Sequence, residues 1–343
     1  MKRRTLLGAG LGVATVAAAP ATAQETLSLS LITDRPQAAA GIAARIAAMS
    51  DGRITIDVQT AGADSAASFL DTVSGGAVDI YLTSQDAFVA RNPAFGLFSA
   101  HPGGMSTSEL ESWIIVSDGR FMWDLLGDEF GIKSFMAGDE GAMPLWSRAP
   151  ITSLDDLKSG PVGSTGLGLQ LLKEMGVTEV VDVMSASDLG SLVALEGLNA
   201  AQMVASGLAA TFPHMTTPNA ARPSAALSLG INMQRWTGLS EADQLLIERC
   251  IMAEHGVHRA LALHENALAL NNEAAGIVPH EMPQDIWDAQ IAAANVVMAS
   301  MFDAGDIAAD TADAYLYFIS DVAEWSEIGE TAYFLGRKEA LSQ

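Results

Sequence analysis

The sequence contains few of the residue combinations that carry out catalysis. His255 and His258 lie three positions apart on one face of an expected helix, whereas His264 lies nearly opposite, so the three do not converge on a metal ion. A Gly-x-Ser-x-Gly nucleophile turn, a pair of cysteines and an HExxH motif are all absent from the sequence. The glycine-rich stretch 163–168 lacks the lysine of a phosphate-binding loop. These observations argue against catalysis and against nucleotide binding.

Other polar residues are better suited to binding a small solute. Ser164 and Thr165 open an expected helix, whose free N–H groups and dipole suit a carboxylate or a hydroxyl. In the alternative interpretation, Gly163 and Gly166 only permit a tight turn between a strand and that helix. Asp86 favours an amine or a hydroxyl if it lies inside a cleft, and then indicates a zwitterionic or polyhydroxylated ligand; outside a cleft it is an ordinary surface acid.

The composition excludes several classes of protein. The 343 residues include 18 basic and 41 acidic side chains, for a net charge of −23, which repels nucleic acids and anionic membrane surfaces. Hydrophobic residues make up 49% of the chain, enough for a large core and too many for a disordered protein. The length is typical of two domains or of one elaborate domain. The single Cys250 can form neither an intramolecular disulfide nor a thiolate metal cage.

The first 23 residues are expected to be an export signal. Lys2, Arg3 and Arg4 precede an apolar stretch at 6–19, and a small-x-small cleavage site follows at 21–23. The arginine pair resembles a twin-arginine signal, which implies export in the folded state to the periplasm. The alternative, a membrane anchor, requires about 20 apolar residues, so we expect a mature protein that is not embedded in the membrane.

The mature chain alternates strands and helices in two successive units, which predicts an α/β fold with two mixed sheets flanked by helices. Expected strands lie at 27–33, 54–58, 78–83, 161–163, 180–184, 201–205 and 227–232. Expected helices lie at 38–49, 66–73, 106–126, 153–157, 167–175, 186–195, 241–272, 283–304 and 311–327. Ser153 is expected to cap its short helix by accepting the N–H of Asp156.

This alternation is typical of bilobed, periplasmic-binding-protein-like folds, which bind ligands in the cleft at the carboxyl ends of their strands. We expect the first lobe to comprise residues 24–141 and 233–280. We expect the second lobe to comprise residues 142–232, and the C-terminal helices to follow at 281–343. The lobes should be hinged near 141–147 and 227–232, and a long helix within 283–304 should brace them both.

Five stretches of the sequence resemble the DctP-type solute receptors of tripartite ATP-independent periplasmic (TRAP) transporters. They are residues 46–56, 73–80, 92–95, 325–330 and, most specifically, 151–158 with the sequence ITSLDDLK. The resemblance covers nearly the whole mature chain and is strongest to the branch that binds 2-oxo acids and related carboxylates. It implies a two-lobed receptor that closes on a small organic solute and delivers it to the membrane subunits of a sodium-driven permease.

The sequence departs from this family at the ligand-binding positions. Gly163 replaces the family arginine that pairs with the ligand carboxylate. Ala142 replaces the glutamine that helps to hold a cation in the 2-oxo-acid branch, and Gln202 and Met203 lie where that branch has Glu-Trp. The resemblance places Arg222 where the family often has a glutamate before proline, so Arg222 could pair with a carboxylate instead. Alternatively, Arg222 is a solvated loop residue; in either case we expect it to contribute little to stability.

Three further residues are candidates for contact with the ligand. Gln85 and Phe88 flank Asp86 after the third expected strand, where the family often places aromatic residues against the ligand. Trp146 could form an apolar wall of the cleft, although packing at the hinge explains it equally well.

The function predicted from the sequence is that of an extracytoplasmic receptor for a small, carboxylate-bearing solute, with no enzyme activity, metal or cofactor. A sensory adapter of the same fold is a related alternative. An exported hydrolase is a more distant alternative, because it needs a nucleophile and base that converge on Asp86, and only His101 and His214 lie in suitable loops.

Overall fold

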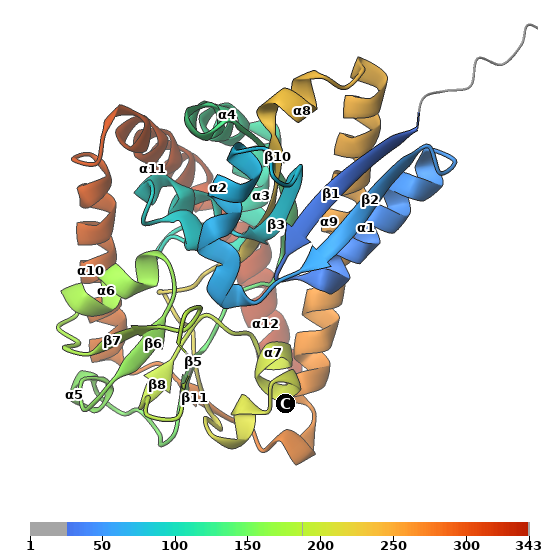
Figure 1. Cartoon of the computed structure of the whole chain (residues 1–343). Coiled ribbons are helices and arrows are strands. Elements are labelled where there is room, and N and C mark those ends of the chain that lie inside the picture. Colours follow the sequence, from blue (N-terminus) through green and yellow to red (C-terminus); the bar gives the residue numbers. More distant parts are fainter. Residues whose placement is uncertain (1–25, 187, 342–343) are drawn as a thin grey trace, which may run out of the picture.

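The computed structural model describes residues 26–341 except residue 187, so the expected export signal lies outside the described residues. Figure 1 shows one mixed sheet in the upper half of the molecule and a second in the lower half, with helices packed around both. This arrangement confirms the predicted fold class. None of the helices in the described part of the chain combines the length and the apolar character needed to cross a membrane.

The first sheet is built around parallel strands. Its strand order is β2 (Ile54–Thr60), β1 (Leu27–Thr33), β3 (Ile80–Ser84), β10 (Ala226–Asn232) and β4 (Ile132–Asp139). Strand β1 pairs in parallel with β2 and β3, and β10 is antiparallel to both β3 and β4. Strands β1 and β3 therefore end at the same edge of the sheet, and the residues that follow them lie close together.

The second sheet is smaller and also mixed. Its strand order is β11 (Val278–Glu281), β9 (His214–Thr217), β5 (Leu145–Ser147), β8 (Ala194–Leu195), β6 (Val162–Ser164) and β7 (Val180–Asp182). Strand β6 pairs in parallel with both β7 and β8, whereas β5 is antiparallel to its two neighbours. Two short segments join the sheets: residues 140–144 connect β4 to β5, and residues 218–225 connect β9 to β10. A third, longer connection runs from β10 to β11 through residues 233–277, which are mostly helical.

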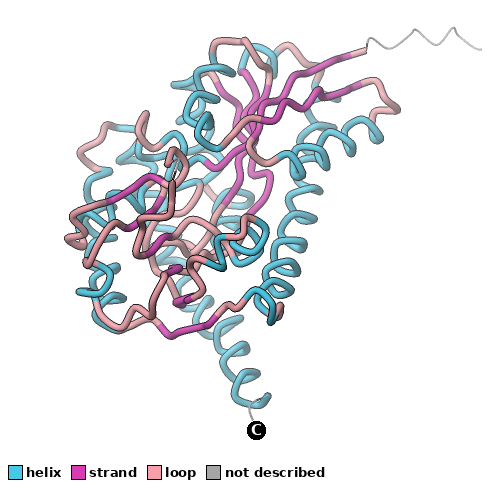
Figure 2. The backbone as a smooth tube through the Cα atoms, turned by 60° about the horizontal axis from the view of Figure 1, so that its bottom comes forward, coloured by secondary structure: helices cyan, strands magenta, loops and turns pink. Residues whose placement is uncertain are grey.

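Helices cover both sheets, with several short 3-10 turns between them. The α-helices are α1 (Pro36–Met49), α2 (Phe69–Ser74), α3 (Thr107–Val116), α4 (Gly119–Phe130), α5 (Leu154–Leu157), α6 (Leu167–Glu174), α7 (Ala200–Ala205), α8 (Met233–Thr237), α9 (Glu241–Leu270), α10 (Gln284–Met301), α11 (Asp306–Ser326) and α12 (Ala332–Leu341). Ser153 caps α5 by accepting the N–H of Asp156 at 3.3 Å, as predicted. Helix α12 has no buried residue and extends away from the rest of the chain in Figure 2.

The helix expected at 283–304 is α10, and it contacts both halves, as does the longer helix α9. The 30 residues of α9 pack against α1 and β4 of the first half and against α7 of the second, and Figure 1 shows this helix running along one side of the molecule. Helix α10 packs on α5 and α6 of the second half, and its Ala294 lies beside Gly103 of the first half, whereas α11 packs on α3 and α4.

Three segments differ from their expected structure. Residues 201–205, expected as a strand, lie in helix α7, because Asn199 and Gln202 form a reciprocal capping box in which each side chain accepts the other's backbone N–H at 2.9 Å. Residues 186–195, expected as a helix, form turns and strand β8 in their described part, and Asp188 accepts the N–H of Gly190 at 2.6 Å. Residues 227–232, expected in the second lobe, form β10 near the centre of the first sheet.

Candidate ligand-binding cleft

A cavity of about 490 Å³ lies where the two halves of the molecule meet. One side is formed by residues that follow strands β1, β3 and β4, and the other by residues that follow β6, β7 and β8. The cavity thus lies at the carboxyl ends of strands from both sheets, the position at which open α/β folds bind ligands. Its polar lining includes Asp34, Arg35, Ser84, Asp86, Glu140, Thr165, Gln202 and Arg222.

Arg222 lies in this cavity and not in bulk solvent. Its side chain is 2% exposed, and its guanidinium forms an ion pair with the carboxylate of Asp86 and donates to the hydroxyl of Thr165. Burial alone would lower the pKa of Arg222, but the carboxylates of Asp86 and Glu196 outweigh burial and raise it. Arg222 is therefore a permanent cation that joins the first half, through Asp86, to the second, through Thr165.

The turn after β6 supplies the second half's side of this contact. The Thr165 hydroxyl donates to Asp86 at 2.9 Å, and Gly166 adopts a φ of 53°, which favours glycine. The Ser164 hydroxyl instead donates to Glu196 at 2.6 Å, away from the cavity lining. Burial raises the pKa of Glu196, although Arg222 and the hydrogen bond from Ser164 oppose the rise. Of the two residues expected to open the helix, only Thr165 lines the cavity.

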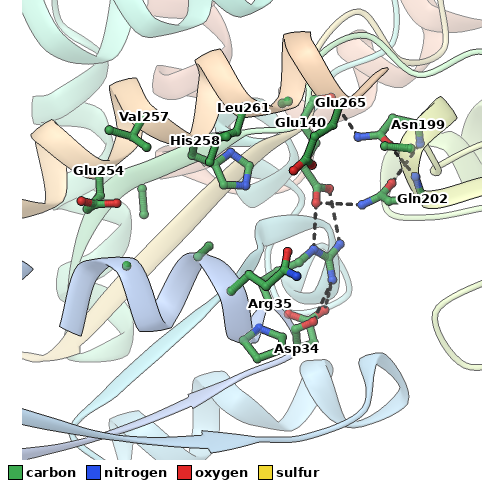
Figure 3. Close-up of a pocket in the computed structure, with 17 residues that line it drawn as sticks. Asp34, Arg35, Glu140, Asn199, Gln202, Glu254, Val257, His258, Leu261 and Glu265 are labelled. Carbon is green, nitrogen blue, oxygen red and sulfur yellow. Dashed lines mark hydrogen bonds and ion pairs between the residues drawn. The ribbon is translucent and has the colours of Figure 1, made fainter. Parts of the chain in front are cut away.

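Arg35 is a second cation in the cleft that the sequence analysis missed. It forms ion pairs with Asp34 at 2.6 Å and with Glu140 at 3.0 Å (Figure 3). Burial would lower its pKa, but the two carboxylates reverse the shift and raise it. Asp34 and Arg35 directly follow β1, and the rule that ligands bind at the carboxyl ends of strands could have identified them.

Gln202 connects the two halves on the other side of the cavity. Its side-chain amide donates to Glu140 at 2.8 Å, and the side-chain amide of Asn199 donates to the backbone carbonyl of Glu140 at 3.2 Å (Figure 3). Asp34, Arg35, Glu140 and Gln202 also line an adjoining cavity of about 420 Å³, which extends between α1 and α9. The cleft therefore continues from Arg222 past Arg35 toward the long helix.

Besides Ser164, five of the expected site residues do not line the cavity. Gln85 is fully buried and accepts a hydrogen bond from the indole of Trp123 at 3.1 Å. Phe88 packs edge-on against Tyr81 and Phe95 in the core of the first half. Their neighbour Asp86 alone faces the cavity, because successive residues of this short 3-10 turn point in different directions.

The other three lie in the core of the second half. Trp146 is fully buried and donates from its indole to the carbonyl of Leu198 at 2.8 Å, and Met203 belongs to the same apolar cluster. At Gly163, a Cβ atom would lie 2.5 Å from the side chain of Val183, so the strand packs too closely there for a larger residue. Core packing, rather than a wall of the cleft, therefore accounts for the position of Trp146.

Comparisons with known proteins agree with this fold. No family model matches the chain. A monocarboxylate 2-oxoacid-binding periplasmic protein of Nostoc sp. is 26% identical over 97% of this chain and 98% of its own length. A TRAP transporter solute-binding protein from Bordetella bronchiseptica, described with calcium and picolinate, superposes with a TM-score of 0.85, 21% identity and coverage of 93% of this chain and 99% of its own. The chain has the fold of a TRAP solute-binding protein.

A second solved structure of this fold extends the likeness. A TRAP periplasmic solute-binding protein from Pseudoalteromonas atlantica, described with sodium and pyruvate, superposes with a TM-score of 0.83, 20% identity and coverage of 90% of this chain and 99% of its own. The resemblance predicted from the five sequence stretches is thus confirmed at the level of the fold.

The positions at which relatives of the 2-oxo-acid branch were expected to hold a cation do not fit one here. The side chain of Ala142 has no metal-binding atom, the side chain of Gln202 is engaged by Glu140 and Asn199, and Met203 is buried in the core. Among residues 26–341 other than 187, no group of three or more histidine, cysteine and acidic side chains is arranged to hold a metal ion.

The two histidines of the hydrolase alternative lie away from the cleft carboxylates. His101 is buried beside the ring of Tyr315, and burial lowers its pKa to about 4. His214 contacts His280, with 2.9 Å between ring nitrogens, on the outer strands β9 and β11. Neither lines the cavity, so the nucleophile–base pair that this alternative requires is not assembled around Asp86.

Asp139 links both segments that cross between the halves, and it predicts a pH dependence of stability. Its Oδ1 accepts the backbone N–H of Gly141 at 2.7 Å and that of Ala225 at 3.3 Å, and burial raises its pKa from 3.8 to about 6. The folded state therefore binds this proton more tightly than the unfolded state does. The ionised Asp139 destabilises the folded protein above pH 6, and this loss of stability disappears as the pH falls toward 4. Relative to Asp139→Asn, the wild type should gain on the order of 2–3 kcal/mol between pH 7 and pH 4.

Urea unfolding of both proteins at several pH values tests this expectation. Asparagine keeps an acceptor for Gly141 and removes only the titration. Parallel curves of unfolding free energy against pH for the two proteins would show that Asp139 titrates normally.

Proposed function

We propose that this chain is an extracytoplasmic solute receptor that captures a small organic carboxylate between its two halves and delivers it to a TRAP permease. The observation that carries the proposal is the cavity at the carboxyl ends of strands from both sheets, with the guanidinium groups of Arg35 and Arg222 in its lining. Relatives described as binding picolinate, pyruvate or other monocarboxylates support the class of ligand. Neither histidine of the hydrolase alternative lines the described cleft, so we propose binding without catalysis.

We further propose that the two sheets are the centres of two lobes that rotate about residues 140–144 and 218–225. The lobes correspond to 24–141 with 233–280, and to 142–232 with 281–343, except that β10 belongs to the first. Contacts between Asp86 and Thr165 and between Glu140 and Gln202 cross the cleft and would form on closure.

We propose export to the periplasm, directed by residues 1–23 and possible in the folded state through the twin-arginine pair. The periplasmic relative from Nostoc supports the compartment. Replacing Arg3 and Arg4 by lysine should retain the precursor in the cytoplasm if the twin-arginine route is used.

A screen of small carboxylates by thermal shift tests the proposed function. A ligand at 100 times its dissociation constant should stabilise the folded protein by about 2.7 kcal/mol. X-ray scattering with that ligand should then show a smaller radius of gyration than scattering without it, because the lobes close. A screen in which no carboxylate stabilises the protein, or a confirmed ligand that leaves the scattering curve unchanged, would contradict the proposal.

A further inference from the structure

Both guanidinium groups in the cleft are already paired with protein carboxylates. Arg222 is paired with Asp86, and Arg35 is paired with Asp34 and Glu140. Since each cation has its own anion, a ligand that brings only a carboxylate would add an uncompensated negative charge to the cleft. The arginines can hold a ligand carboxylate only if another positive or hydrogen-bond-donating group compensates the carboxylates of Asp86, Asp34 and Glu140.

The charge balance of the cavity is negative before any ligand enters. Asp34, Asp86 and Glu140 line it against two arginines, and no lysine or histidine is part of the lining. Glu196 lies directly behind, within electrostatic range of both Arg222 and Asp86. A simple anion therefore meets net repulsion, whereas a positive group is attracted.

Unused hydrogen-bonding atoms occur on both members of the Arg222 ion pair. Within the described residues, Oδ1 of Asp86 and Oδ1 of Asp34 are buried and have no hydrogen-bond donor, and Nε of Arg222 is buried and has no acceptor. The side chains of Asp34, Asp86 and Arg222 are 2%, 5% and 2% exposed, and all three residues line the cavity. Buried polar atoms of this kind are normally satisfied, and a ligand is one means of satisfying them.

From these observations we propose that the solute carries an ammonium group beside its carboxylate, and is therefore a zwitterionic amino acid or a close analogue. The carboxylate accepts from Arg222, and the ammonium donates to the unpartnered oxygens of Asp86 or Asp34. The zwitterion adds no net charge to the cleft, and it supplies both the donor and the acceptor that the ion pair lacks. The volume of about 490 Å³ accommodates a molecule of this size. This inference rests on the proposed function, because it specifies the ligand of the same cleft.

A matched ligand panel tests the inference on the full chain. Each common amino acid is compared by calorimetric titration with the 2-hydroxy acid, the 2-oxo acid and the amino alcohol of the same carbon skeleton, with and without sodium and calcium. We expect an amino acid to bind at least tenfold more tightly than its hydroxy and oxo counterparts, without a requirement for either cation. Equal or tighter binding of a hydroxy or oxo acid, or binding of an oxo acid only with sodium or calcium, would overturn the inference and leave the carboxylate receptor intact.

Two further outcomes separate the inference from the proposed function. Binding of an amino alcohol alone would support the ammonium site and contradict the carboxylate receptor. If no amine-bearing compound binds, the inference is overturned. The thermal-shift screen of small carboxylates then decides whether the proposed function still holds.

Substitution of Asp86 provides a second test. Asp86→Asn keeps the shape of the side chain and removes its charge, so it should weaken an amino acid at least tenfold and leave an oxo acid unchanged or bound more tightly. Asp71→Asn is the matched control, because Asp71 forms an exposed ion pair with Arg91 outside the cleft, and it should change neither affinity. If Asp86→Asn does not fold, Asp34→Asn makes the same comparison. If Asp86→Asn weakens amino acids and oxo acids by the same factor, the carboxylate of Asp86 does not recognise an ammonium group.

Discussion

Replacing Arg222 with alanine is expected to weaken an acidic or zwitterionic ligand by about 30- to several-thousand-fold. The guanidinium is buried and charge-assisted, and loss of one member of a desolvated ionic contact costs on the order of 2–5 kcal/mol of binding energy. Arg222→Lys should recover only part of the affinity, because an ammonium cannot donate simultaneously to Asp86, to Thr165 and to a ligand in one plane. Calorimetric titration of both variants measures the effect.

The same substitution should also destabilise the protein, which corrects the expectation from the sequence. Arg222 is not a solvated loop residue; its removal leaves Asp86 buried without a counter-ion, at a cost of about 3–5 kcal/mol. Binding must therefore be measured under conditions where circular dichroism shows the variant to be folded. Arg91→Ala, which breaks the exposed ion pair with Asp71, is the matched control and should affect neither stability nor affinity appreciably. Unaltered binding by folded Arg222→Ala would exclude Arg222 from ligand recognition.

Substitution of Gly166 by alanine is expected to prevent the cleft from closing. A Cβ atom at this position would lie 2.6 Å from Oδ1 of Asp86, and Asp86 cannot move aside because Arg222 and Thr165 hold it. The φ of 53° adds backbone strain of about 1–3 kcal/mol for a residue other than glycine. Together these effects should reduce ligand affinity about ten- to several-hundredfold, and saturating ligand should no longer reduce the radius of gyration.

The variant Gly52→Ala is a control that separates the steric contact between residue 166 and Asp86 from the backbone strain of a positive φ. Gly52 also has a positive φ, of 76°, but no atom lies within 4 Å of the Cβ position, and it is in a surface turn of the first half. This control should lose some stability and keep normal affinity and closure. If Gly166→Ala and Gly52→Ala behave alike in binding, contact between Gly166 and Asp86 does not limit closure.

The elements of the first sheet were predictable because each has a distinct local pattern. Strand β1 has the predicted bounds 27–33, and helix α1 ends at Met49, before the turn at 50–52 that the sequence indicated. In these segments the apolar period, the capping residues and the glycines all favour the same structure. Helix α7 shows the limit of this approach. Its residues AQMVA were predicted as a strand, although Ala, Gln and Met favour a helix and the capping pair Asn199 and Gln202 begins one.

The composition of the cleft was only partly predictable. Asp86, Thr165, Gln202 and Arg222, all named from the sequence, line one cavity, although their contact with a ligand stays a prediction. Their neighbours Gln85 and Met203 face the core instead. Adjacent residues in short turns and helices point in different directions, so a position in the sequence identifies the segment and leaves the orientation of each side chain open.

The sequence by itself determined the alternation of strands and helices, the acidic charge and the resemblance to a family of solute receptors, because these depend on local patterns and composition. Only the tertiary structure decided that β10 belongs to the first sheet, that α9 spans both halves, and that Arg222 lies against Asp86, 136 positions away in the sequence. Such long-range pairings depend on which surfaces bury each other when the chain closes on itself. The charge balance of the cleft, and with it the class of ligand that we propose, arises from that pairing.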